Sequence, residues 1–284
     1  MAVVAFGRFI VGAFHVHDPT FVAAAFDLVA SFFTLYLLYR LSVDFPSRGL
    51  LTQNQRLLTI TLFLAIIQFP LAWVVPFQRL ETLPTALYLA ISLFCFAKSR
   101  TNRLWLLLVP IAALGQSFVR ADVPFSFGLA IILVALSESF GKNSRFHREE
   151  LGTGVLVLLL AGAAQVYLQF IRFPHLSYQP GTSVIQLRSN LTFHVFSNFT
   201  IALLPFLLFS AFLIIKRPKL DIIDKLVLAS SVLYLPLWFT VGVISEVRIY
   251  VPFLFALSMV AAKVFASYAN GSGLRDQFST FPTH

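Results

Sequence analysis

Acidic and basic residues stand two positions apart where several apolar runs of this sequence end. Glu246 and Arg248 open the stretch Glu246-Val-Arg-Ile-Tyr-Val-Pro-Phe, and Arg120 and Asp122 lie in a similar stretch ahead of a proline. A carboxylate can serve as a general base, while a guanidinium can bind a phosphate through two parallel hydrogen bonds. Residues of these types have the chemistry needed to activate a hydroxyl group and to stabilise a departing phosphate.

Each pair also has a simpler interpretation, in which its two charges neutralise each other at a membrane boundary. Charged groups at such a boundary are costly, however, unless they are paired or used. Arg79 and Glu81 form a third pair, and the connection 174–196 carries Arg188 and His194. If all these connections face one side, they predict a polar cavity that opens on that side.

The composition indicates an integral membrane protein. Of the 284 residues, 58% are hydrophobic and only 12% are charged, whereas soluble domains carry about 25% charged residues. We therefore predict an all-α, polytopic transmembrane bundle that forms one integral membrane domain over residues 1–284. The net charge of +9 does not indicate nucleic-acid binding, because the basic residues lie in short connections between apolar runs.

Nine apolar runs predict membrane-spanning helices, for which about 20 residues are typical. The runs cover residues 20–41, 56–77, 82–97, 104–119, 123–137, 152–173, 197–215, 222–243 and 249–269. The third, fourth and fifth runs are short, and the fourth and fifth could instead form a re-entrant hairpin without changing the orientation of the others. Residues 1–19 are expected to be an interfacial segment, and residues 270–284 a tail.

Lys and Arg are unevenly distributed between the two sides of the predicted bundle. Fifteen of the 21 fall on one side, when Lys263 is counted with the tail. Because cytoplasmic loops are enriched in Lys and Arg, we predict that this side is cytoplasmic and that the N-terminus is outside. The cytoplasmic connections are interpreted as merely basic, and all the charge pairs described above are placed at the outer face.

Two stretches resemble bacterial polytopic membrane glycosyltransferases of the GT-C superfamily. EVRIYVPFLFAL, which begins at Glu246, is similar to a late segment of those proteins, where an acid and an arginine precede a proline. The stretch from Gln116 to Pro124 is similar to an arginine-plus-acid turn between their short central helices. The resemblance implies an enzyme of the bacterial inner membrane that acts at the outer face, with membrane lipid and a polyprenyl-phosphate-linked sugar donor as partners.

Sugar transfer from a lipid phosphate requires a base for the acceptor hydroxyl and cations for the departing phosphate. The candidate bases are Asp18 and Asp122. The residues predicted to bind substrate or phosphate are Arg120, Arg188, Glu246, Arg248, Tyr250 and His194. Two histidines beside Asp18 could hold a divalent metal, but the sequence offers no further ligand, so no metal site is predicted.

The sequence departs from the pattern of the superfamily at its start, where the usual first span and most of the first outer loop are absent. A chain that lacks a preceding helix is therefore expected, with Asp18 as a remnant of that loop. Two other classes stay open. One is a non-catalytic membrane subunit or degenerate relative that binds a membrane protein partner through its helices. The other is a lipid or solute transporter, which would favour two related halves.

Overall fold

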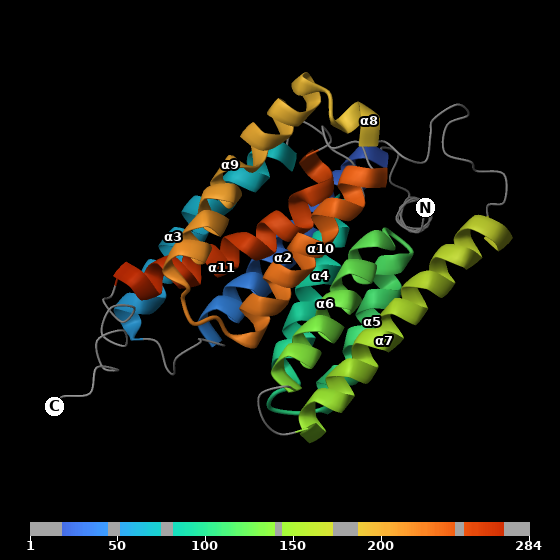
Figure 1. The fold of residues 1–284 in the computed structure, drawn as a ribbon, viewed down its shortest axis with the longest axis horizontal. Helices are drawn as coiled ribbons and strands as arrows, with labels where there is room; N and C mark the ends of the chain where they lie inside the picture. Colours follow the sequence, from blue (N-terminus) through green and yellow to red (C-terminus); the bar gives the residue numbers. More distant parts are fainter. Residues whose placement is uncertain are drawn as a thin grey trace.

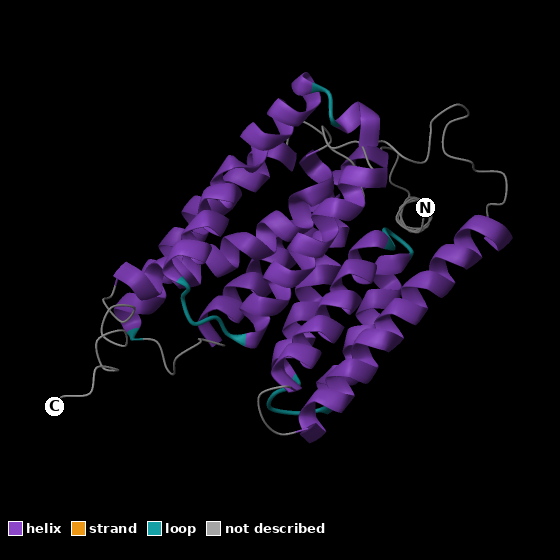
Figure 2. Ribbon diagram, viewed as in Figure 1, coloured by secondary structure: helices purple, strands orange, loops and turns teal. Residues whose placement is uncertain are grey.

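The computed structural model describes residues 19–44, 52–74, 82–139, 144–172, 187–241 and 247–269, and every regular element among them is a helix (Figure 2). A helix pairs its own backbone donors and acceptors, which an apolar membrane interior requires. The elements are α2 (Pro19–Asp44), α3 (Gln53–Val74), α4 (Thr82–Lys98), α5 (Leu104–Ser117), α6 (Asp122–Ser139), α7 (Ser144–Val166), the π-helix η2 (Tyr167–Arg172), α8 (Leu187–Asn190), α9 (Phe193–Lys216), α10 (Ile222–Val241), the 3-10 helix η3 (Val247–Tyr250) and α11 (Val251–Ala269). The all-α prediction is confirmed for these residues.

Five helical stretches are long and apolar enough to cross a membrane: Ala25–Asp44, Asp122–Ser139, Arg148–Arg172, Ile222–Thr240 and Val251–Ala269. Each of the nine predicted runs contains a helix, and α6 is longer than the predicted run 123–137. α5, with 14 residues, is the shortest of the nine. The number of spans and their direction across the membrane stay predictions.

α11 is the central helix of the bundle. It contacts α2, α3, α4 and α10 (Figure 1), and 78% of its apolar stretch is buried. Small buried residues recur along it, among them Ala256, Ser258, Ala261 and Ala262. Small side chains allow neighbouring backbones to approach closely, which is how helices pack when lipid offers no hydrophobic driving force.

Two glycines bring α6 and α7 into backbone contact. A Cβ atom added to Gly128 would lie 3.1 Å from the carbonyl oxygen of Gly154, and one added to Gly154 would lie 2.9 Å from that of Gly128. Neither carbonyl can move without disturbing its own helix. This seam therefore fixes the position of α6.

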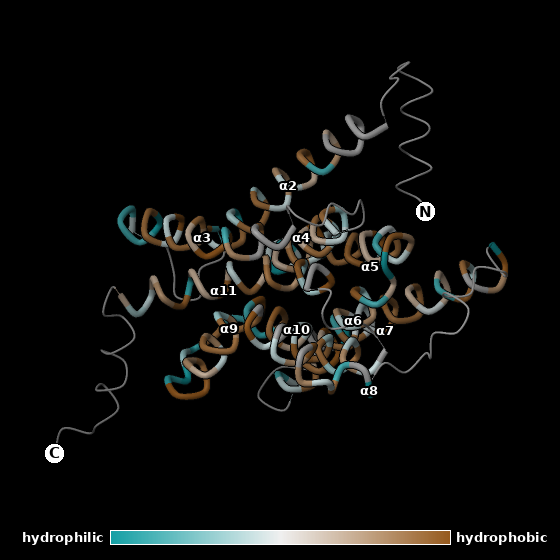
Figure 3. Tube along the Cα trace, turned by 90° about the horizontal axis from the view of Figure 1, so that it is seen from above, coloured by the Kyte–Doolittle hydropathy of each residue, from teal (hydrophilic) through white to brown (hydrophobic). Residues whose placement is uncertain are grey.

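α9 packs against α11 through aromatic rings rather than through close backbone contact. The ring of Phe212 lies 5.2 Å from those of Phe265 and Tyr268, and Phe209 lies 5.6 Å from Phe265. α9 also exposes large apolar side chains, among them Ile201, Leu208, Ile214 and Ile215, and much of its trace has the brown colour of hydrophobic residues in Figure 3. Lipid would cover them in a membrane.

The end of the bundle predicted to be cytoplasmic is not merely basic, because acids pair with its cations. Arg103 lies 2.5 Å from Glu149, and Lys225 forms an ion pair with Glu138. These pairs join the start of α5 to α7 and the start of α10 to α6. The prediction overlooked the acids of this end because they lie next to a larger number of Lys and Arg residues.

Lys263 belongs to α11 rather than to the tail. Its Nζ atom lies 2.6 Å from Asp221 Oδ2 and 2.8 Å from Asp224 Oδ1, at the start of α10. Lys263, Asp221 and Asp224 are called the Lys263 triad below. The triad fastens the first turn of α10 to the last turns of α11.

Candidate functional site

The turn between α5 and α6 positions two of the predicted site residues. The Gln116 side chain is buried and donates a hydrogen bond to the carbonyl oxygen of Thr85, at 3.0 Å, which holds the end of α5 against α4. The carbonyl oxygen of Gln116 accepts the N–H of Arg120 at 2.7 Å, so the chain turns sharply. α6 then begins at Asp122, which places both charged side chains next to α10.

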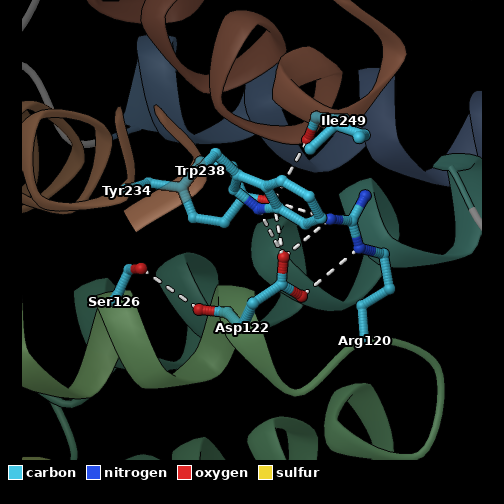
Figure 4. Close-up of polar contacts among 6 residues, drawn as sticks. All are labelled: Arg120, Asp122, Ser126, Tyr234, Trp238 and Ile249. Atoms are coloured by element: carbon cyan, nitrogen blue, oxygen red, sulfur yellow. Dashed lines mark hydrogen bonds and ion pairs between the residues drawn. The ribbon is translucent and has the colours of Figure 1, made fainter. Parts of the chain in front are cut away.

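The carboxylate of Asp122 is the hub of the site (Figure 4). Its Oδ2 atom accepts hydrogen bonds from Arg120 Nη2 at 2.6 Å, from the Tyr234 hydroxyl at 2.7 Å and from Trp238 Nε1 at 2.6 Å. Its Oδ1 atom accepts a longer bond from Arg120 Nε at 3.3 Å. Arg120, Asp122, Tyr234 and Trp238 are called the Asp122 cluster below.

Arg120 has three kinds of contact in this cluster. Besides the two bonds to Asp122, its Nη2 atom donates to the Tyr234 hydroxyl at 2.7 Å, and its guanidinium carbon lies 5.0 Å from the centre of a Trp238 ring. Only 10% of the Arg120 side chain is exposed. Arginine stays charged at all ordinary pH values, so the carboxylate and the aromatic face replace water around its charge.

Tyr234 joins the cluster to the start of α11. Its side chain is fully buried, and its ring lies 5.7 Å from that of Tyr250 and 4.5 Å from that of Phe253. Its hydroxyl lies 3.4 Å from the carbonyl oxygen of Ile249. The α5–α6 turn and the η3–α11 junction, more than one hundred residues apart in sequence, therefore meet at this tyrosine.

The structure brings together three of the predicted site residues, which are Arg120, Asp122 and Tyr250. Arg188 is exposed on α8 and is not a bonding partner in the Asp122 cluster. Asp18 and Glu246 lie outside the described residues. So do the side chains of Arg248 and His194, although their backbones belong to η3 and α9.

Sequence reasoning missed Tyr234 and Trp238 because both lie within an apolar run. A signal was available, since residues four positions apart share one face of a helix. Both are also aromatic residues with a polar tip, and such tips require a partner when they are buried. A Tyr and a Trp with this spacing in an apolar helix thus predict an acceptor on a neighbouring helix, and Asp122 is that acceptor.

Asn190 is buried, and its side chain donates to the carbonyl oxygen of Phe239 at 2.8 Å. It stands in an Asn-Leu-Thr sequence that matches the pattern for N-linked glycosylation. A buried amide that is bonded to backbone cannot accept a glycan in this conformation. Asn190 instead fastens α8 to α10.

The chemistry of the Asp122 cluster follows from its bonds. A carboxylate that accepts hydrogen bonds on both oxygens is a counter-ion rather than a free base, because its lone pairs are engaged. Asp122 can act as a base only when it loses some of these hydrogen-bond donors. Among the described residues, no group of three His, Cys, Asp or Glu side chains is arranged to hold a metal ion.

No family model matches this chain, and no curated protein or solved structure matches it either. The fold and composition alone define the class to which it belongs. It is an all-helical protein in the part that the structure describes, with five helices able to span a membrane, and we treat it as an integral membrane protein.

Proposed function

We propose that the chain is a glycosyltransferase-like membrane protein that binds the phosphate of a polyprenyl-phosphate-linked sugar at the Asp122 cluster. The supporting observation is the placement of Arg120, a largely buried arginine held beside a carboxylate at one end of an apolar bundle. An ionisable residue inside an apolar bundle, with its partner named, is a candidate functional site by default, and Arg120 with Asp122 is such a pair. The predicted orientation would put this end at the outer face, and the resemblance to GT-C enzymes implies that the membrane is the bacterial inner membrane.

The geometry suggests how binding and chemistry are linked. A phosphate that approaches the guanidinium competes with Asp122 for its two parallel donors. When the phosphate takes those donors, Asp122 loses its bonds from Arg120, and its Oδ1 atom is left without a donor. It can then accept the proton of an acceptor hydroxyl while that oxygen bonds to the anomeric carbon. The bond from that carbon to the phosphate oxygen breaks, and Arg120 retains the lipid phosphate.

Binding of a polyprenyl phosphate to the purified chain tests the first step. Arg120→Lys keeps the charge but loses the planar fork, so we expect a loss of roughly ten- to a hundredfold in affinity, as for one charge-assisted bond. Lys225→Gln is the matched control, because it removes a cation from α10 at the opposite end of the bundle. Equal affinities in wild-type protein and Arg120→Lys would remove the Asp122 cluster from the proposal.

A non-catalytic membrane subunit or degenerate relative is the second candidate, and the engagement of both Asp122 oxygens favours it. In that role the cluster would hold α6, α10 and α11 together and would never release its carboxylate. Release of polyprenyl phosphate from a lipid-linked sugar by proteoliposomes separates the two candidates. The enzyme requires turnover that Asp122→Asn abolishes, whereas lipid binding without turnover supports the subunit.

A further inference from the structure

The connection between α9 and α10 differs from its neighbours at the same end of the bundle. The adjacent cations are paired, as in Arg40 with Asp44, Arg103 with Glu149, Lys225 with Glu138, and the Lys263 triad. Lys216, Arg217 and Lys219 are all exposed, and none of the acids in the described part of the chain forms an ion pair with them. Three cations thus gather here without a counter-charge from those acids.

Capping of α9 does not account for these side chains. Basic residues near a helix C-terminus often stabilise its last carbonyl groups. Here the carbonyl oxygen of Leu213 accepts the backbone N–H of Arg217 at 2.8 Å, and that of Lys216 accepts the Tyr268 hydroxyl at 3.2 Å. The backbone and α11 supply these partners, so the three cationic side chains are not needed for them.

The backbone at Arg217 is left-handed, with φ 44° and ψ 53°. This region is costly for a residue that carries a Cβ atom, by about 1–2 kcal/mol. Arg217 is the only non-glycine residue with a positive φ in the described part of the chain. The turn ends α9 abruptly at Lys216.

The residues just before the turn place it at a membrane surface. Ile214 and Ile215 are 72% and 74% exposed in the last turn of α9. Side chains of this size and exposure belong among lipid acyl chains. With these isoleucines among the acyl chains, the cations that directly follow would lie at the level of the lipid headgroups.

We propose that Lys216, Arg217 and Lys219 bind the phosphate of an anionic phospholipid whose acyl chains lie along Ile214 and Ile215. Basic residues next to a membrane-spanning segment attract anionic headgroups. The neighbouring isoleucines favour a lipid over a free anion, because they provide an apolar surface for its chains. This site lies at the opposite end of the bundle from the Asp122 cluster and does not depend on the function proposed there.

The test measures phosphatidylglycerol binding to the full chain in a zwitterionic detergent, by native mass spectrometry. Each basic residue beside the bound headgroup should contribute about fivefold in affinity, the value for a basic residue that attracts an anionic lipid, so Lys216→Gln/Arg217→Gln/Lys219→Gln should lose roughly a hundredfold. Phosphatidylcholine should bind weakly and equally to both proteins. The thermal midpoint should be unchanged in the variant, since these side chains are exposed and form no ion pair with the described acids.

Arg56→Gln/Arg148→Gln is the control for diffuse attraction, because both residues are exposed cations at other positions of the same end. It should change phosphatidylglycerol affinity by less than threefold. A loss per charge equal to that of the triple variant would overturn the site in favour of general electrostatics. Displacement of the lipid by an equal concentration of inorganic phosphate would overturn it in favour of a free-anion site.

Discussion

The Asp122 cluster and the Lys263 triad lie at the two ends of α10, and they solve the problem of a charge in an apolar bundle in different ways. In the cluster, one carboxylate and one guanidinium balance each other, and Tyr234 and Trp238 complete the hydrogen bonds. In the triad, one ammonium lies between two carboxylates. The end of α10 thus contributes the aromatic hydrogen-bond donors of the Asp122 cluster, and the start of α10 contributes the two acids of the Lys263 triad.

The start of α10 helps to offset the extra negative charge of the triad. The N–H of Asp224 donates to Asp221 Oδ1 at 2.7 Å, and the N–H of Asp221 points back to Asp224 Oδ2 at 3.4 Å. Both carboxylates therefore lie at the positive end of the helix dipole, which stabilises them. This reciprocal arrangement is a capping box made from two aspartates.

The two sites also differ in exposure, and this difference separates a structural role from a binding role. In the triad the side chains of Lys263, Asp224 and Asp221 are 6%, 1% and 18% exposed, whereas in the cluster those of Arg120 and Asp122 are 10% and 22% exposed. A ligand cannot reach Lys263 or Asp224 without unpacking α10 from α11, although Asp221, the third member of the triad, is partly exposed. The Asp122 cluster is more accessible, so it is the site at which a ligand can compete.

Removing the cation of the triad should have the largest effect. Lys263→Met leaves two carboxylates without their ammonium partner, and breaking a buried ion pair from one side costs about 3–5 kcal/mol. The free energy of unfolding, measured by titration with dodecyl sulfate, should fall by that amount. The triple variant Lys263→Met/Asp221→Asn/Asp224→Asn should recover most of the loss. An unchanged free energy in Lys263→Met would show that the triad does not fasten α10.

The carboxylate of the Asp122 cluster should matter less to stability. Asp122→Ala leaves Arg120, Tyr234 and Trp238 without their shared acceptor, but water can reach this end of the bundle. We expect a loss of about 1.5–3 kcal/mol, the range for hydrogen bonds to a charged group. A double-mutant cycle with Arg120→Gln measures the coupling directly. Additive losses in the cycle would contradict a bonded pair.

The Tyr234 hydroxyl should have a smaller effect than the carboxylate. Tyr234→Phe keeps the ring between Tyr250 and Phe253 and removes only the bonds to Asp122, Arg120 and Ile249. The expected loss is about 1.5 kcal/mol, the lower end of the range for hydrogen bonds to charged groups, read from the same dodecyl sulfate titration. No loss in Tyr234→Phe beside a large loss in Tyr234→Ala would place the contribution in the ring rather than in the hydroxyl.

The smallest effect is expected for the ion pair between Lys225 and Glu138. Both side chains are partly exposed, and exposed pairs contribute about 0.2–1 kcal/mol. Lys225→Gln should therefore lower the free energy of unfolding only slightly, and the loss should shrink as salt is raised. The loss in Lys263→Met should respond much less to salt, which sharpens the contrast between exposed and buried charge.

The helices could be predicted from the sequence because membrane helices are specified locally. Apolar runs of sufficient length formed helices at all nine predicted places, since lipid leaves the backbone no other way to satisfy its polar groups. The pair Arg120 and Asp122 could also be predicted, because two positions of sequence separate the partners. Its orientation relative to the membrane depends on charge bias alone and stays a prediction.

The rest of the Asp122 cluster and the Lys263 triad depend on contacts between residues far apart in sequence. No local sequence pattern reveals such contacts. Asp122 and Trp238 are bonded across 116 positions of sequence, and Lys263 and Asp221 across 42. Lys263 was assigned to the tail because charge counts treat every cation alike, whether it lies in a loop or in a helix. The acids Asp221 and Asp224 gave a usable signal, since their spacing of three is that of a helix start.

The shortness of α5 has a consequence for the lipid around the protein. Its 14 residues rise roughly 21 Å, while the hydrocarbon layer is about 30 Å thick. If the start of α5 lies at one surface, the turn that carries Arg120 and Asp122 lies about 9 Å below the other. Hydrophobic mismatch of this size is relieved by local thinning of the bilayer or by tilt. The bilayer would therefore be locally thinned above the Asp122 cluster, and this thinning would cost more energy in a thicker bilayer.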